Sequence, residues 1–193
     1  MQENKSFEDR TLVIPASIIP YGSWYSRCYT RFLNHAEKAI RDENYYQDKQ
    51  IIPYIVLLNQ QDKIFTYKRF EHEARLSDLV SIGVGGHIQG DEDLVTCAQR
   101  ELLEETGIDI KHRLQILGVI NSDKSPVDRA HIGFPIFLRV TDLTPRKEGK
   151  FPLNIDDPEA WKTDAEIRDL PNLETWSYLS LDLMDLILRN ERR

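Results

Sequence analysis

The stretch GVGGHIQGDEDLVTCAQRELLEETGI, residues 83–108, sets three glutamates on one short segment directly after a glycine-rich turn. Apolar residues recur in it at every fourth position, which predicts a helix with one buried face over residues 93–106: Leu94, Ala98 and Leu102. Asp91 and Asp93 are both suited to cap the N-terminus of this helix. Gly107 suits the left-handed conformation that commonly ends a helix.

The glutamates of this helix lie beside its buried face. On a helical wheel with Glu101 as the reference, Glu105 lies about 40° to one side and Glu104 about 60° to the other. Glu101 and Glu105 therefore border the apolar stripe, where a lower dielectric strengthens the repulsion between like charges. Arg100 points further round the helix and is a single positive charge against three carboxylates.

A divalent cation satisfies this charge requirement. Mg²⁺ prefers oxygen ligands and binds proteins through a few carboxylates together with substrate phosphates. The glycines of residues 83–86 allow the backbone to approach a ligand or an ion closely. Taken singly, the same residues also fit a solvated glutamate-rich face and a simple turn before a helix, and these two interpretations stay open at this point.

The remaining pattern predicts a single mixed α/β domain. Strands are predicted over residues 51–60, 64–70, 80–86, 114–121 and 130–140, and helices over 24–44, 93–106, 163–170 and 180–189. Residues 1–22 and 144–160 are predicted to be irregular, and Pro135 suggests an edge strand or a bulge. We expect an N-terminal extension over residues 1–50, with one helix, packed on a globular domain over residues 51–193.

Composition excludes several classes of protein. The chain has 193 residues, of which 40% are hydrophobic and 30% charged, as is typical of a soluble globular protein. Its net charge of -7 argues against a nucleic-acid surface. There is no apolar run of membrane-spanning length, and the first ten residues lack the order of a secretory signal, so a cytoplasmic location is expected. Cys28 and Cys97 are expected to be plain thiols.

The residues from Gly86 to Ile108 resemble the Nudix box, G-x5-E-x7-R-E-U-x-E-E-x-G-U with U an aliphatic residue, at every specified position. The chain is thus similar to the Nudix hydrolases. Three shorter segments, residues 83–88, 131–134 and 174–177, also look like a bacterial Nudix subgroup described only as predicted phosphoesterases. That second likeness names no substrate.

The Nudix resemblance implies a fold, a reaction and a set of site residues. The fold is an α/β/α sandwich around a mixed sheet. The reaction is hydrolysis of a pyrophosphate linkage in a nucleoside diphosphate linked to another group, with Mg²⁺ or Mn²⁺. The resemblance assigns the metal to Glu101, Glu104, Glu105 and the backbone carbonyl of Gly85, and a structural ion pair to Glu92 and Arg100.

Roles outside the metal set follow less directly. We assign the general base to Glu104, with an acid of a distal loop, Asp157 or Glu159, as the alternative. The residues considered for substrate binding are Arg69, Arg75 and His131, with His87 less favoured. For the two tryptophans nearest the C-terminus, Trp161 and Trp176, core packing is favoured over stacking on a base.

Other functions remain as alternatives. A Nudix-fold nucleotide-binding or regulatory domain without turnover would typically have lost its glutamates, and none is lost here. An isomerase of prenyl diphosphates would require a catalytic cysteine opposite the acids. RNA decapping is disfavoured by the acidic balance. The N-terminal extension is expected either to cap the pocket of a small nucleotide-derived substrate or to form a homodimer interface.

Overall fold

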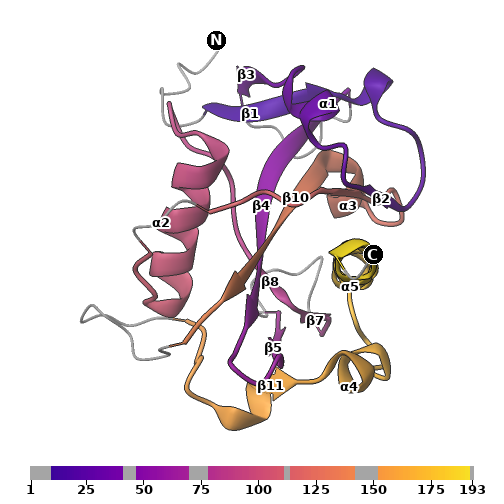
Figure 1. The fold of residues 1–193 in the computed structure, drawn as a ribbon. Helices are drawn as coiled ribbons and strands as arrows, with labels where there is room; N and C mark the ends of the chain where they lie inside the picture. The colour runs from indigo at the N-terminus through magenta and orange to yellow at the C-terminus, as the bar shows by residue number, and fades with distance from the viewer. Residues whose placement is uncertain (1–9, 41–46, 70–77, 111–113, 142–151, 192–193) are drawn as a thin grey trace.

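Strand β4 (Asp48–Leu58) is the central strand of the fold. Residues 49–57 are all buried, because this β-branched and aliphatic run has a layer of structure on each face. The computed structural model describes residues 10–40, 47–69, 78–110, 114–141 and 152–191. Figure 1 shows β4 running through the middle of the molecule beside β10 (His131–Arg139).

A mixed sheet forms on both sides of β4. β10 runs parallel to β4 over its whole length, from His131 opposite Gln50 to Arg139 opposite Leu58. Beyond β10 the sheet continues with two short antiparallel strands, β9 (Val119–Asn121) and β2 (Trp24–Ser26). On the other edge of β4, three strands pair in succession: β1 (Arg10–Pro15), β8 (Gly83–Val84) and β5 (Ile64–Phe65).

Further short strands complete the β structure. β3 (Glu37–Ile40) pairs with β1, and β11 (Trp161–Lys162) pairs with β5. β6 (Tyr67–Lys68) and β7 (Val80–Ser81) form a separate two-stranded sheet. Short helical segments connect these strands: η2 (Ala16–Ile18), α1 (Thr30–Leu33), α3 (Pro126–Ala130) and η3 (Pro158–Ala160).

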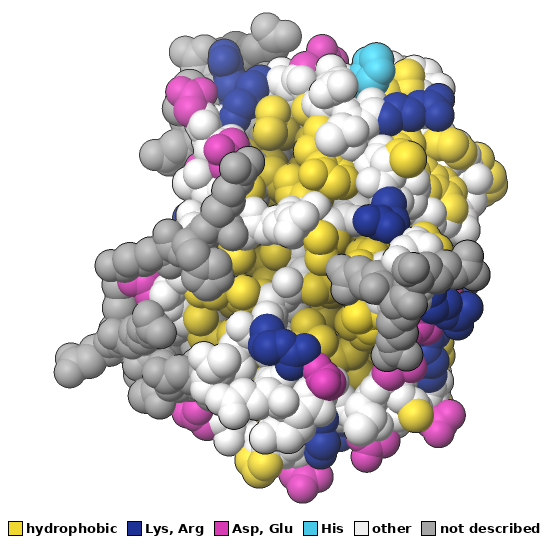
Figure 2. Space-filling model, in the orientation of Figure 1, with side chains coloured by type: hydrophobic (Ala, Val, Ile, Leu, Met, Phe, Trp, Pro, Cys, Tyr) yellow, Lys and Arg dark blue, Asp and Glu magenta, His cyan; other side chains and the backbone are white. Residues whose placement is uncertain are grey.

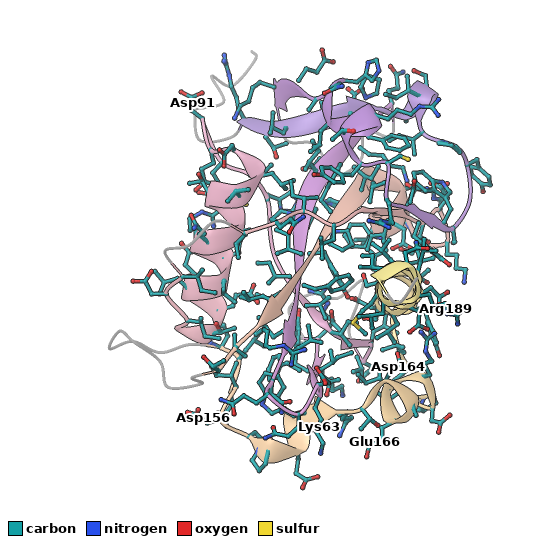
Figure 3. The ribbon with its side chains drawn as sticks, in the orientation of Figure 1. Lys63, Asp91, Asp156, Asp164, Glu166 and Arg189 are labelled. Atoms are coloured by element: carbon teal, nitrogen blue, oxygen red, sulfur yellow. The ribbon has the colours of Figure 1, made fainter. Side chains whose placement is uncertain are left out.

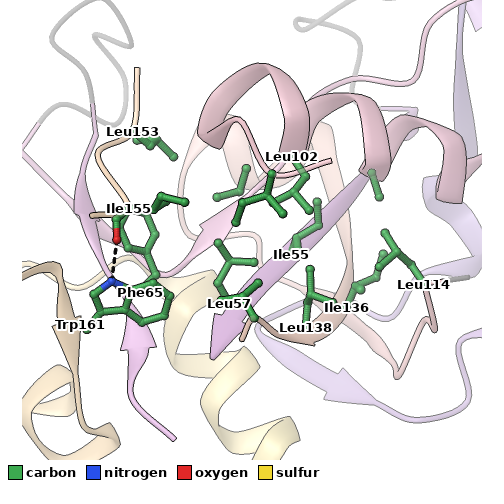
Figure 4. Close-up of a cluster of buried hydrophobic side chains, with 14 residues drawn as sticks. Ile55, Leu57, Phe65, Leu102, Leu114, Ile136, Leu138, Leu153, Ile155 and Trp161 are labelled. Atoms are coloured by element: carbon green, nitrogen blue, oxygen red, sulfur yellow. Dashed lines mark hydrogen bonds between the residues drawn. The ribbon is translucent and has the colours of Figure 1, made fainter. Parts of the chain in front are cut away.

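Helices cover both faces of the large sheet. α2 (Leu94–Thr106) packs on one face, while α4 (Asp164–Arg168) and α5 (Thr175–Glu191) lie on the other (Figure 1). Under α2, Ile55 and Leu57 of β4 contact Leu102 and Ile136, and the Trp161 indole in the same core donates a hydrogen bond of 2.9 Å to the Ile155 carbonyl (Figure 4). The predicted α/β/α sandwich around a mixed sheet is confirmed.

The predicted helix over residues 24–44 is wrong. Its described part contains β2, the four-residue helix α1 and β3 instead. The aromatic spacing that suggested a helix places Trp24 on Phe32, with ring centroids 5.3 Å apart, across a chain reversal. Pairing of β2 with β9 provides hydrogen bonds for backbone N–H and C=O groups that a helix would have bonded within itself. Tertiary structure therefore outweighs the helical spacing of the apolar residues.

The N-terminal residues are more regular than predicted. Within the stretch 1–22, residues 10–15 form β1, whose Pro15 is the terminal residue of the strand and lies opposite Asp48. The predicted division of the chain at residue 50 falls within β4. Because β1 adds to the edge of β4, this part of the extension packs on the domain as a strand of the same sheet.

Pro135 is predicted to mark an edge strand or a bulge, and the edge strand is wrong, because β10 is an internal strand paired with β4 and β9. The Pro135 carbonyl accepts a hydrogen bond of 3.0 Å from the Leu117 N–H, so the proline nitrogen faces the same side as that carbonyl. On this side the only register pair recorded between β10 and β9 in the described structure is Gly133 opposite Ile120. Pro135, which has no N–H, therefore lies where the hydrogen bonding between β10 and β9 is interrupted, so no bond between these strands is lost.

Lys49 joins β4 to the end of β9 and to α3 through a buried polar network. Lys49 is 4% exposed, and its ammonium donates to Asn121 Oδ1 and Asp123 Oδ1, each at 2.7 Å, and to the carbonyls of Ser122 and Asp128, each at 3.0 Å. Burial lowers the pKa of Lys49, and the Asp123 carboxylate opposes that shift. The network fixes α3, which leads directly into His131 at the start of β10.

Most of the other predicted elements are present with adjusted limits. β4 and β5 form the predicted hairpin, with Leu58 opposite Ile64, and α5 begins earlier than predicted. Within the described segments, no helix is both long and apolar enough to cross a membrane. On the face shown in Figure 2, hydrophobic side chains occupy the centre and charges of both signs are interspersed around it.

Candidate active site

The helix α2 has the predicted limits because its two ends are capped. Asp93 Oδ1 accepts a hydrogen bond of 2.7 Å from the Thr96 N–H, which also lowers the pKa of Asp93. Asp91, the other candidate cap, points away from the helix in Figure 3. Gly107 has a φ of 74°, the left-handed conformation that glycine adopts at little cost. These caps fix the positions of the glutamates along the helix.

Arg100 attaches the loop after the glycines to α2. Its Nε and Nη2 donate to the two oxygens of Glu92, at 2.8 and 3.0 Å, in a bidentate ion pair. Nη2 also donates to the carbonyl of His87 at 2.9 Å. Hydrogen bonds from Arg100 lower the pKa of Glu92. The two residues assigned to a structural ion pair are therefore in direct contact.

Glu101 lies against the glycine turn. Its side chain is buried, and a Cβ built on Gly86 would lie 2.3 Å from Glu101 Oε1. A Cβ on Gly85 would lie 1.9 Å from the carbonyl oxygen of Pro53. Both glycines are thus required by close approach, Gly86 to a carboxylate and Gly85 to the backbone of β4. Burial raises the pKa of Glu101, and hydrogen bonding to Arg100 opposes this shift.

Arg100 also reaches the predicted metal-binding acids. Its Nη1 lies 2.6 Å from Glu101 Oε1 and 3.2 Å from Glu104 Oε2. The helical wheel places Arg100 further round the helix, but its long side chain brings the guanidinium back to these two acids. Glu104 is 57% exposed, whereas Glu105 is half-buried and its carbonyl accepts a hydrogen bond from the Leu153 N–H.

The acids suit a divalent cation, although the side chains of Glu101 and Glu104 contact Arg100. Within the described residues, no three His, Cys, Asp or Glu side chains converge as a ready metal site. The donor set nevertheless fits Mg²⁺ or Mn²⁺. Three carboxylates lie within two turns of the helix, next to the loop in which Gly86 has no side chain. Glu92 and the His87 carbonyl would hold Arg100 in place if Glu101 and Glu104 turned to a cation.

Two histidines connect this turn to β10. The Nε2 atoms of His87 and His131 lie 3.0 Å apart, and His131 Nδ1 lies 2.7 Å from the Val127 carbonyl. A carbonyl only accepts, so His131 Nδ1 carries a proton; in the neutral pair its Nε2 then accepts from His87. His131 is 7% exposed. The structure brings this predicted substrate-binding residue next to the Nudix-like segment.

Arg69 belongs to a second buried network. Its Nε and Nη2 each lie 3.3 Å from Glu174 Oε2, and its guanidinium stacks over the Tyr67 ring. Glu174 also accepts hydrogen bonds from the Tyr54 hydroxyl at 2.5 Å and the Ser81 hydroxyl at 2.6 Å. Arg69 thus holds β6 to the start of α5, and its role in substrate binding stays a prediction. Arg75 lies outside the described residues.

The two loop acids lie on a segment that reaches the C-terminal part of α2, where the Leu153 N–H donates to the Glu105 carbonyl at 3.0 Å. Asp157 caps η3 by accepting from the Glu159 N–H at 2.9 Å, and both acids are exposed. As predicted, the tryptophans pack: Trp161 is buried in the α2 core, and Trp176 meets Tyr54 edge-on at 5.7 Å.

Cys97 does not have the properties of a nucleophile. It is buried within α2, and burial raises the pKa of its thiol to about 12. Its Sγ lies 3.7 Å from the Gly86 carbonyl, on the same helix as the acids and not opposite them. This arrangement does not favour the isomerase alternative.

Comparison with known proteins agrees with this arrangement. The NUDIX domain family matches residues 49–184. The chain therefore belongs to the Nudix family of hydrolases, as the resemblance of residues 86–108 predicted.

One protein of known sequence and two solved structures illustrate this similarity. Protein YmaB of Bacillus subtilis (strain 168) is 32% identical over 151 residues, which are 71% of each chain. The crystal structure of Tm1382, assigned to the Nudix hydrolases, superposes with a TM-score of 0.65 at 25% identity and covers 91% of this chain and 97% of that one. The Nudix domain of Shewanella oneidensis NrtR, solved with ADP ribose, has a TM-score of 0.53 at 16% identity over 72% and 88% of the two chains.

Proposed function

We propose that this protein is a metal-dependent hydrolase that cleaves the pyrophosphate linkage of a nucleoside diphosphate joined to another group. The single observation that carries this proposal is the set Glu101, Glu104 and Glu105 standing beside the Gly85–Gly86 turn. The presence of ADP ribose in the related NrtR domain supports a substrate of this class. Family membership supports the reaction type.

The residues have distinct roles in this proposal. Glu101, Glu104, Glu105 and the Gly85 carbonyl would hold Mg²⁺ or Mn²⁺, which when bound neutralises phosphate charge and lowers the pKa of a water molecule. Glu104, the most exposed of the three acids, accepts the proton of the attacking water. Arg100 and Glu92 keep the glycine turn on α2 throughout. Asp157 and Glu159 remain the alternative bases.

A nucleotide-binding or regulatory domain without turnover is the competing function. It is favoured by one observation, the contact of Arg100 with Glu101 and Glu104, which neutralises the acids without a metal. The complete acidic set favours the hydrolase. A cytoplasmic location and a homodimer stay predictions.

A substrate screen tests the proposal. Purified protein is incubated with nucleoside diphosphate sugars, ADP-ribose, dinucleoside polyphosphates and nucleoside triphosphates, with Mg²⁺ and then with Mn²⁺, and products are separated by chromatography. We expect cleavage of a diphosphate-linked substrate to give a nucleoside monophosphate, and we expect EDTA to abolish it. Tight binding of these nucleotides without any product under either metal would favour the regulatory alternative.

A further inference from the structure

Among the described residues of the large sheet, Gln50 and Thr11 carry polar side chains that are buried without hydrogen-bond partners. Gln50 is 2% exposed and Thr11 is 1% exposed. Within the described structure, neither the amide nitrogen nor the amide oxygen of Gln50 has a partner, and the Thr11 hydroxyl has none either. A buried polar group without a partner loses its hydration and gains no hydrogen bond in return, so an apolar residue would make this fold more stable at each position.

The two side chains share one face of the sheet. Gln50 pairs in register with Val13, and Thr11 lies two residues before Val13 on the same strand. Val13 and Ile52 are the buried apolar neighbours on this face, on the same strands as Thr11 and Gln50. Trp176 packs against Gly133 of the same face, and its indole nitrogen is also buried without a partner in the described structure.

This face is the one covered by α5, opposite to α2, and it is connected to the candidate active site through His131 and His87. Gln50 is directly opposite His131 on β10, and neighbouring strands are about 4.8 Å apart. His131 contacts His87, which follows Gly86, and Gly86 abuts the Glu101 carboxylate. On the other edge of β4, β1 pairs with residues 48–50 and β8 with residues 55–56, so strand pairing is interrupted beside Gly85 and Pro53.

We propose that Gln50 and Thr11 bind the nucleobase of the substrate and that this base is adenine. A primary amide presents a donor and an acceptor side by side, which match the N6 amino group and a ring nitrogen of adenine in a bidentate pair. The Thr11 hydroxyl adds one adaptable polar contact, and Val13 and Ile52 offer apolar contact to the ring. The identity of the ligand rests on the proposed function.

Access to these atoms requires local opening. Both amide atoms of Gln50 are buried from solvent. A base therefore reaches them only when side chains that cover this face, such as Trp176 at Gly133, move aside. Binding of adenine would then satisfy groups that the closed fold leaves without partners. A role in base binding accounts for a glutamine and a threonine at two positions where leucine and valine would pack.

Equilibrium binding without metal tests this proposal apart from turnover. Affinities for AMP, GMP and ribose 5-phosphate are measured by calorimetry for the parent protein, for Gln50→Leu and for Thr11→Val. The parent should prefer AMP over the other two. Gln50→Leu should weaken AMP binding about tenfold to a hundredfold while leaving ribose 5-phosphate unchanged and the melting temperature equal or higher. Thr11→Val, which preserves shape, should weaken AMP binding less.

Gln115→Leu, the same chemical change at an exposed position, is the matched control and should leave all affinities unchanged. Equal binding of AMP and ribose 5-phosphate by the parent, or AMP binding unaltered in both Gln50→Leu and Thr11→Val, would overturn the proposal. If the parent binds AMP through Gln50 but hydrolyses nothing in the substrate screen, the proposed function fails and the base site stands. The two failures are therefore distinguishable.

Discussion

Glu104→Gln is expected to lower kcat/KM about a thousandfold while the protein stays folded. The substitution preserves the shape of the side chain but removes a negative charge and the capacity to accept a proton. Because the Glu104 side chain is 57% exposed and is held by a 3.2 Å surface ion pair with Arg100, stability should change little. Steady-state kinetics on the substrate found in the screen, with a thermal melt of each protein, measure both effects. Glu105→Gln should behave in the same way.

The loop acids provide a control that also decides the identity of the base. Glu159→Gln and Asp157→Asn make the same kind of change at exposed acids of the loop before β11. If Glu104 is the base, both variants retain parental activity. Loss of activity in Glu159→Gln or Asp157→Asn as large as that in Glu104→Gln would assign the base to the distal loop and leave Glu104 the metal-binding role alone. Full activity in Glu104→Gln and Glu105→Gln together would place the reaction at another site.

Gly86→Ala is expected to reduce kcat/KM about tenfold to a hundredfold with only a modest effect on stability. The new methyl group would lie 2.3 Å from Glu101 Oε1, and the carboxylate, the end of a flexible side chain, can move aside. The displaced carboxylate would no longer lie beside the turn, so the metal requirement should rise. The Mg²⁺ concentration that gives half-maximal rate measures this directly.

Gly85→Ala is the informative contrast. Here the methyl group would lie 1.9 Å from the Pro53 carbonyl oxygen, and a backbone atom of the central strand cannot move aside cheaply. This variant should lose stability, about 1–3 kcal/mol by the cost of overpacking, before any specific effect on metal requirement is visible. A Gly86→Ala protein with parental Mg²⁺ dependence and parental activity would contradict the role given to the Gly86–Glu101 contact.

Local signals made the central helix predictable. Its periodicity, the Asp93 cap and the left-handed Gly107 act within a few residues of one another, so α2 and the order of the glutamates follow from the sequence. The helix predicted over residues 24–44 is wrong because that prediction also used local signals alone. The aromatic spacing of this segment suits a helix locally, but the pairing of β2 with β9, nearly a hundred residues away in sequence, determines its conformation.

The contacts between distant residues were beyond sequence reasoning. Tyr54 and Glu174 are 120 positions apart, and Lys49 and Asp123 are 74 apart, so no spacing rule connects either pair. The reach of Arg100 to Glu101 and Glu104 depends on side-chain conformation, which a helical wheel does not describe. A tyrosine or lysine in an otherwise apolar strand was the one available sign that a buried partner existed.

The most direct measurement is a Mn²⁺ titration followed by the electron paramagnetic resonance of the free ion. Parent protein is compared, with and without ADP, to a variant in which Glu101, Glu104 and Glu105 are all glutamine, after circular dichroism has shown both to be folded. The account predicts saturable Mn²⁺ binding by the parent, tightened by ADP and weakened more than about tenfold in the variant. Equal Mn²⁺ binding by the two proteins, or no saturable binding by the parent even with ADP, would contradict it.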